Sequence, residues 1–146
     1  NIRASHDIAE VTLHVGLGTF AKLTDEQLKA GHLHEEHYEI DEHTAEVLNR
    51  ATHRTAVGTT SVRTLESAWK QDGFSPTSSG TSILIQPGYN YKAVDALITN
   101  FHLPGTSLLL LVEAFVGSAD ALQKIYDHAI TERYRFYSFG DAMLVL

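Results

Sequence analysis

One segment combines a glycine, several hydroxyl groups and an arginine at the start of a predicted helix. Gly58 follows the apolar, strand-like stretch 55–57, and Arg63 lies about one turn into the helix. Free backbone N–H groups and the helix dipole attract an anion at such a turn, and side-chain hydroxyls add further donors. A guanidinium group can also fork onto a carboxylate or a phosphate. We therefore predict an anion site here, with the hydroxyl donors Thr59, Thr60 and Ser61.

A structural interpretation of the same segment stays open. In that case Thr60 or Ser61 only caps the helix. Arg63 then pairs with Glu66, three residues along the same helix. A Walker A loop is excluded, because its glycine spacing and its lysine are missing from this segment.

A second polar segment, HLHEEH at 32–37, combines three histidines with two glutamates. If it is extended, His34 and Glu36 lie on one face with Tyr38 and Ile40 and form a candidate general acid–base pair. The alternative is an exposed polar strand. No HExxH pair is present, and the histidines share a face only in conflicting secondary structures, so we expect no metal.

The third segment, TNFHLPGTS at 99–107, reads as a strand end, a rigid turn and a helix start. Ligands bind at the carboxyl ends of strands in open α/β sheets. Asn100 and His102 lie there, with polar tips suited to a base or a ribose. As an alternative, Asn100 satisfies the turn backbone and His102 is a packed, hydrogen-bonded core residue.

The fourth segment, RYRFYSFGD at 133–141, interleaves Arg133 and Arg135 with four aromatic residues. Such a stripe can clamp phosphates and stack a base, as in RNA-binding proteins. The alternative is core packing by the aromatic rings, with both arginines in solvent.

The chain around these residues predicts alternating strands and helices. Apolar and polar residues alternate over 11–15, with a glycine turn at 16–18, and Ser, Thr and Gly at 72–81 predict a loop. The alternation of elements predicts an α/β fold, a layered sandwich in which helices flank a largely parallel sheet. Other strands are expected at 32–40, 55–57, 82–86, 96–100 and 142–146, and helices at 24–30, 41–51, 108–115 and 119–134, with one ending near 71.

Composition narrows the class of protein. The 146 residues are 43% apolar and contain no Cys, so one core can form without disulfides. Thiolate zinc sites and cysteine nucleophiles are excluded. The longest strictly apolar run, 108–112, is too short to cross a bilayer. Residues 1–10 hold no apolar stretch, so we expect no secretory signal and no membrane partner.

Charge is placed unevenly along the chain. The net charge of −7 excludes a generic polycationic nucleic-acid binder. Residues 1–50 carry ten acidic and four basic residues, whereas residues 51–146 carry eight acidic and seven basic ones. The nearly neutral second part permits a phosphate-binding face.

Several of these segments belong to longer motifs that occur together. LHVGLGTF spans 13–20, VGTTSVRTLES spans 57–67, TNFHLP spans 99–104 and YRFYSFGDAML spans 134–144. With these motifs in this order, the chain resembles the S-adenosylmethionine:tRNA ribosyltransferase-isomerase family of queuosine biosynthesis.

The resemblance implies a reaction and a domain plan. Family enzymes transfer and isomerise the ribosyl moiety of S-adenosylmethionine onto 7-aminomethyl-7-deazaguanine at the tRNA wobble position. The products are epoxyqueuosine, adenine and methionine; S-adenosylmethionine is the co-substrate, and no metal takes part. Family proteins are more than twice this length and carry a β-barrel inserted in an α/β domain. We therefore interpret 1–146 as the C-terminal portion of the α/β catalytic domain, without the barrel, in a cytoplasmic monomer.

The resemblance also suggests catalytic roles. His34 and His102 are the leading general acid–base candidates, because histidine titrates nearest neutral pH. Glu36 is placed to orient one imidazole.

The remaining candidates are assigned to binding. The 59–61 turn with Arg63 holds an anionic group, either the methionine carboxylate or a tRNA phosphate. Asn100 reads the edge of adenine or deazaguanine, and Arg133 and Arg135 steer the tRNA backbone. Two other functions stay open: a non-catalytic tRNA-binding fragment, and an S-adenosylmethionine-dependent methyltransferase, whose usual glycine-rich loop is missing.

Overall fold

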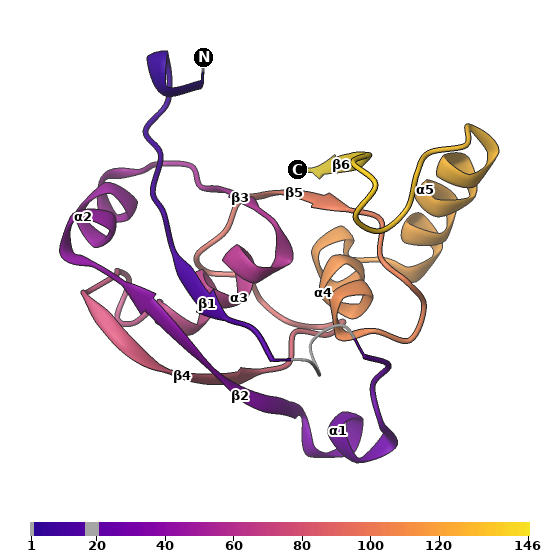
Figure 1. The fold of residues 1–146 in the computed structure, drawn as a ribbon, viewed down its shortest axis with the longest axis horizontal. Coiled ribbons are helices and arrows are strands. Elements are labelled where there is room, and N and C mark those ends of the chain that lie inside the picture. The colour runs from indigo at the N-terminus through magenta and orange to yellow at the C-terminus, as the bar shows by residue number, and fades with distance from the viewer. Residues whose placement is uncertain (1, 17–20) are drawn as a thin grey trace.

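The computed structural model describes residues 2–16 and 21–146, which form a mixed α/β fold (Figure 1). Part of the glycine turn expected at 16–18 lies outside the described residues. The strands are β1 (Thr12–His14), β2 (His32–Ile40), β3 (Thr55–Val57), β4 (Thr77–Ile83), β5 (Ala96–Asn100) and β6 (Ala142–Val145). The helices are the 3-10 turn η1 (Ile2–Ala4), α1 (Asp25–Ala30), α2 (Glu42–Arg50), α3 (Thr59–Ala68), α4 (Ser107–Val116) and α5 (Ala119–Thr131).

The first sheet has the order β1-β2-β4, and both of its pairings are antiparallel. Along β2 the side chains of Glu36, Tyr38 and Ile40 are buried, and the residues between them are exposed. The pairing register with β4 shifts between His32 and Glu36. The regular alternation of buried and exposed residues therefore starts only at Glu36.

The second sheet has the order β3-β5-β6, with β3 parallel to β5 and β6 antiparallel to β5. The α/β class is confirmed, but the expectation of a largely parallel sheet is wrong for the described strands. Parallel strands are buried on both faces and read as continuous apolar runs. β2 alternates and β4 (TSSGTSI) is mostly polar, which suits an antiparallel sheet with one exposed face.

The position of β4 is also a correction. The expected strand at 82–86 begins earlier, at Thr77, inside the stretch that was predicted to be a loop. Ser, Thr and Gly favour turns by composition, but here they pair with 36–40 of β2. Pairing with a neighbour far away in sequence therefore decides the structure of this segment.

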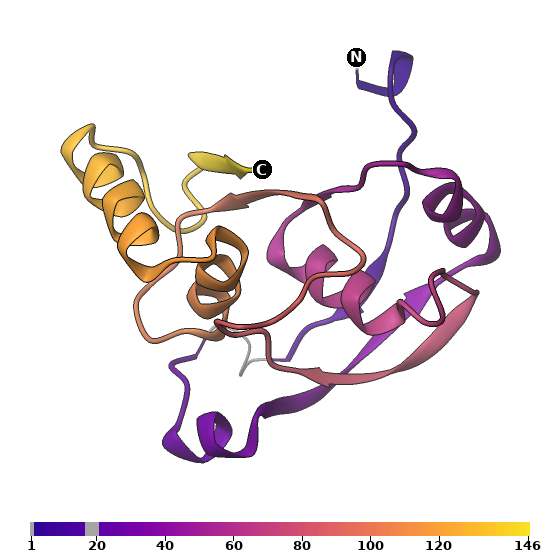
Figure 2. The same ribbon diagram turned by 180° about the vertical axis from the view of Figure 1, so that it is seen from behind.

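Helix α3 lies between the two sheets and contacts strands of both (Figures 1 and 2). Its side chains Val62 and Leu65 belong to the hydrophobic core, together with Tyr38, Leu97 and Val112. Helices α4 and α5 pack against each other at one end of the molecule, opposite the end that carries α2 (Figure 1). This arrangement holds the start of α3 against both sheets.

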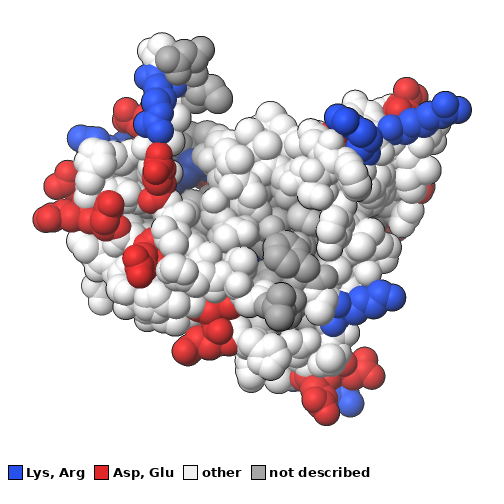
Figure 3. Space-filling view, viewed as in Figure 1, with Lys and Arg blue, Asp and Glu red and all other residues white. Residues whose placement is uncertain are grey.

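Apart from the buried Glu36, the acidic residues of 1–50 lie on the surface. On the face in Figure 3, Asp and Glu side chains lie over the region of α2, β2 and α1, and Lys and Arg side chains lie at the corner near the end of α5 and at a few other points. No helix in the described part of the chain has the length and apolar content needed to cross a membrane.

Candidate functional site

A buried ion pair joins β2 to α3. The Arg63 Nη1 donates to Oε2 of Glu36 at 2.5 Å, and the two side chains are only 3% and 6% exposed. The other carboxylate oxygen, Oε1, accepts the backbone N–H of Gly16 at 2.7 Å. Glu36 therefore ties together the chain after β1, the middle of β2 and the first turns of α3.

The Arg63 guanidinium has further donors inside this cluster. Its Nε and Nη2 are buried and have no hydrogen-bond partner among the residues that the structure describes. These two nitrogens form the side edge of the guanidinium, which is the edge that binds carboxylates and phosphates in a bidentate manner.

Helix α3 starts without a side-chain cap. Its N-cap is Gly58, with φ 89° and ψ 145°, and no side chain accepts from the first turn. Ser61 instead donates its hydroxyl back to the carbonyl of Val57 at 2.8 Å, and Thr59 is buried. The alternative in which Thr60 or Ser61 caps the helix is therefore wrong.

The alternative pairing of Arg63 with Glu66 is also wrong. The buried Glu66 carboxylate accepts the Tyr89 hydroxyl at 3.0 Å and the Ala93 backbone N–H at 2.9 Å. A third donor is the backbone N–H of Lys92. Glu66 thus anchors the loop before β5, and Arg63 is directed toward β2 instead.

His34 and Glu36 differ in their surroundings. Glu36 is buried, whereas His34 is exposed and lies within the register shift of β2. The shift interrupts the two-residue period that was expected to place them on one face. The acid–base role of His34 stays a prediction.

His102 is half-buried and lies two residues after the end of β5. Its Nε2 lies 2.8 Å from the Thr99 hydroxyl, and its backbone N–H donates to the Tyr126 hydroxyl at 2.9 Å. Burial lowers the pKa of His102 from 6.5 to about 4, so the imidazole is neutral at pH 7. His102 is therefore hydrogen-bonded as the structural alternative expected, but it is half-buried and not a core residue; its catalytic role stays a prediction.

Asp141 connects Asn100 with the C-terminal segment. The Asn100 side-chain amide donates to the Asp141 backbone carbonyl at 3.1 Å. The Asp141 carboxylate accepts hydrogen bonds from both Nε and Nη2 of Arg135, at 3.1 and 3.0 Å. Sequence reasoning missed Asp141 as a partner, although it ends the same arginine-rich segment.

The aromatic residues of this segment divide between core and surface. Phe136 packs against Phe101 and Tyr126, as the structural alternative expected. Phe139 is 70% exposed, and Arg133 and Arg135 are exposed as well. The two arginines thus remain available to solvent, in a segment that also exposes Tyr134 and Tyr137.

The topology brings two of the predicted segments to one edge of the second sheet. Val57 of β3 pairs with Ile98 of the parallel strand β5, and the Gly58 N–H donates to the Ile98 carbonyl at 2.8 Å. The 58–61 turn and the turn after Asn100 therefore both follow carboxyl ends of neighbouring parallel strands. This is the edge at which ligands bind in α/β folds.

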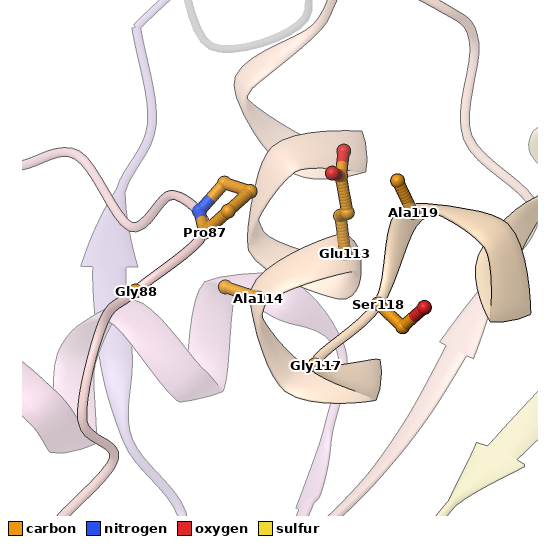
Figure 4. Close-up of a pocket in the computed structure, with 7 residues that line it drawn as sticks. All are labelled: Pro87, Gly88, Glu113, Ala114, Gly117, Ser118 and Ala119. Carbon is orange, nitrogen blue, oxygen red and sulfur yellow. The ribbon is translucent and has the colours of Figure 1, made fainter.

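A small pocket lies elsewhere, where the junction of α4 and α5 faces the loop after β4 (Figure 4). Its volume of about 60 Å³ is far below the roughly 300 Å³ at which small-molecule sites begin. It includes none of the predicted site residues. The pocket is lined by Pro87, Gly88, Glu113, Ala114, Gly117, Ser118 and Ala119.

Within residues 2–16 and 21–146, no group of three His, Cys, Asp or Glu side chains is arranged to hold a metal ion.

The sequence of this chain matches one protein family over nearly its whole length. The description of that family is queuosine biosynthesis protein, and the match spans residues 2–145. The chain belongs to this family.

Relatives within the queuosine biosynthesis family carry a more specific name. The chain is 49% identical to the S-adenosylmethionine:tRNA ribosyltransferase-isomerase of Natranaerobius thermophilus, over 95% of the chain and 42% of that relative. It is 52% identical to the protein of the same name from Rubrobacter xylanophilus, over 95% of the chain and 40% of the relative. It therefore spans about two fifths of the length of these curated relatives.

A solved structure shares the fold. The crystal structure of S-adenosylmethionine tRNA ribosyltransferase from Thermotoga maritima superposes with a TM-score of 0.74 at 42% sequence identity. The match covers 94% of the present chain and 44% of the Thermotoga chain. The fold of this chain is thus shared with part of the Thermotoga protein.

Proposed function

We propose that this chain is the C-terminal portion of the α/β catalytic domain of an S-adenosylmethionine:tRNA ribosyltransferase-isomerase, with the β-barrel outside it. The observation that carries the proposal is the identity of about 50% to relatives of that name over 95% of the chain. The reaction moves the ribosyl moiety of S-adenosylmethionine onto 7-aminomethyl-7-deazaguanine at the tRNA wobble position and isomerises it to epoxyqueuosine. Adenine and methionine leave. In this proposal S-adenosylmethionine is the co-substrate and the reaction needs no metal. The protein acts as a monomer in the cytoplasm.

The chemistry requires a base that removes a proton next to the sulfonium and a group that protonates the departing adenine. His34 and His102 are the residues that we assign to these steps. At pH 7 the neutral His102 takes part as a proton acceptor or through its N–H, because its pKa is about 4. Exposed His34 is the residue that we assign to the leaving adenine.

Other residues bind the substrates in this proposal. The start of α3 with Arg63 receives an anionic group beside Glu36, at the edge that also carries Asn100. Asn100 reads a purine edge through its amide. Arg133 and Arg135 attract the tRNA backbone, because both are exposed on the segment after α5.

The test uses the full-length protein and follows a label on S-adenosylmethionine into the products. With S-adenosylmethionine labelled on its methyl group, the proposed reaction releases the label in methionine and frees adenine. Label in the tRNA refutes the proposal and identifies a methyltransferase. Binding of tRNA with no turnover identifies a non-catalytic tRNA-binding protein.

Site variants test the acid–base roles separately. His34→Gln and His102→Gln are each expected to slow adenine release by about 100-fold or more, the usual contribution of a general acid or base. His43→Gln on α2 is the matched control, because His43 is exposed and lies outside the site. Full turnover in both site variants contradicts the assigned roles, while the reaction itself is judged from the label.

A further inference from the structure

Arg63 has one occupied donor and one unoccupied edge. Nη1 donates to Glu36, whereas Nε and Nη2 are both buried without a partner among the residues the structure describes. The whole residue is 2% exposed. Buried donors are almost always hydrogen-bonded in native proteins, so a pair of unsatisfied ones on one edge points to an acceptor that binds there.

The geometry of that edge selects a planar acceptor with two oxygens. Nε–H and Nη2–H of a guanidinium are parallel and match the two oxygens of a carboxylate. Arg63 belongs to the second turn of α3, and helical side chains lean toward the N-terminus. The start of this helix has no side-chain cap and carries positive partial charge.

The burial of Arg63 and the charge of its pair with Glu36 favour a carboxylate over a phosphate as the ligand of this edge. A tRNA phosphodiester has a nucleoside on each side and cannot be enclosed at a group that is 2% exposed. A terminal carboxylate has a substituent on one side only, so it needs less room than a phosphodiester. The Arg63–Glu36 pair is also neutral as a unit, so it suits a zwitterion better than an anion. An α-ammonium group beside the bound carboxylate is attracted by Glu36.

We infer that the Nε–Nη2 edge of Arg63 binds the α-carboxylate of the amino-acid moiety of S-adenosylmethionine. This inference rests on the proposed function and chooses between the two anions that the function leaves open. Glu36 is a positioning residue in this arrangement, because it holds the guanidinium and balances its charge. No covalent change takes place at this subsite.

The experiment compares two ligands that differ only in the carboxylate. Binding of S-adenosylmethionine and of decarboxylated S-adenosylmethionine is measured by calorimetry with the full-length protein. We expect the wild type to prefer the carboxylated ligand by on the order of 10- to 100-fold, the range for hydrogen bonds to charged groups. Arg63→Lys keeps the charge and removes the fork, so it loses this preference while its affinity for the decarboxylated ligand stays within about twofold.

Arg50→Lys is the matched control, because Arg50 is exposed at the end of α2. It is expected to keep the wild-type preference. Equal losses for both ligands in Arg63→Lys overturn the inference and leave Arg63 a structural role. Unchanged S-adenosylmethionine binding combined with weaker, less salt-dependent tRNA binding overturns it in favour of a phosphate.

A measurement on the wild type covers the case in which Arg63→Lys does not fold. The ¹⁵Nε signal of a buried arginine is expected to shift with S-adenosylmethionine and not with the decarboxylated ligand. A wild type that binds both ligands equally, yet releases adenine, refutes only the carboxylate subsite. A wild type that binds neither ligand refutes the proposed function as well.

Discussion

The Glu36–Arg63 pair makes a quantitative prediction about the stability of the chain. Both side chains are nearly inaccessible, at 6% and 3% exposure, so removal of one partner leaves the other charge buried. Loss of one member of such a pair costs about 3–5 kcal/mol. We expect Arg63→Met to fall in this range. Glu36→Gln is expected at its lower end, because an amide oxygen can still accept from the Gly16 N–H.

The double variant measures how much of the stability comes from the interaction between Glu36 and Arg63. Glu36→Gln with Arg63→Met leaves no buried charge in the cluster, so its loss should be smaller than the sum of the single losses by about 1–3 kcal/mol. Urea unfolding of the chain, followed by far-UV circular dichroism, measures all three variants. Each single variant should lower the urea midpoint by roughly 1–3 M.

An exposed pair on the same chain is the control. Arg135 and Asp141 have comparable hydrogen bonds, but their side chains are 65% and 27% exposed. Arg135→Met should therefore cost at most about 1 kcal/mol. Additive losses in the double variant, or single losses as small as that of Arg135→Met, refute the reasoning that burial makes the Glu36–Arg63 pair decisive.

Three further outcomes follow from the surroundings of single residues, each measured by urea unfolding. The pKa of His102 is about 4 in the folded chain and 6.5 in the unfolded chain. The stabilisation that neutral His102 gives to the fold is therefore complete above pH 6.5 and is lost as the pH falls toward 4. Relative to His102→Gln, the wild type should lose about 2 kcal/mol between pH 7 and pH 4.5 after allowance for partial exposure, and a pH-independent difference contradicts this. Gly58→Ala should cost about 1–3 kcal/mol, because φ is 89° and ψ 145° there, and a neutral effect means that the start of α3 adopts another conformation. Glu66→Gln should cost about 1–3 kcal/mol, because the buried carboxylate accepts from Tyr89, Lys92 and Ala93; an unchanged midpoint shows that the loop holds without it.

Local signals in the sequence predicted several elements correctly. The helix expected at 24–30 is α1, in which Thr24 and Gln27 form a capping box at the start and Gly31 caps the end with φ 72°. The helix expected at 41–51 is α2, in which Asp41 accepts the Thr44 N–H and the apolar residues Ala45, Val47 and Leu48 are buried. These features depend on residues three or four positions apart, so the sequence contains all the information they need.

Pairing between strands was not predictable in the same way. β4 is polar and turn-like by itself, and only its neighbour β2 makes it a strand. A largely parallel sheet was expected, yet among the described strands only β3 and β5 pair in parallel, and the other pairings are antiparallel. Strand propensity describes a half-buried surface, and that surface exists only after the sheet has formed.

The candidate site shows the same division. By itself the sequence determined the local elements, the family motifs and the residues able to do chemistry, Glu36 and Arg63 among them. Only the tertiary structure decided that these two residues, 27 positions apart, form one buried pair and that Arg63 does not contact Glu66. It also decided that His102 is neutral, because burial sets its pKa. Desolvation and long-range contacts depend on what surrounds a side chain, and a residue's own neighbours in sequence do not specify that environment.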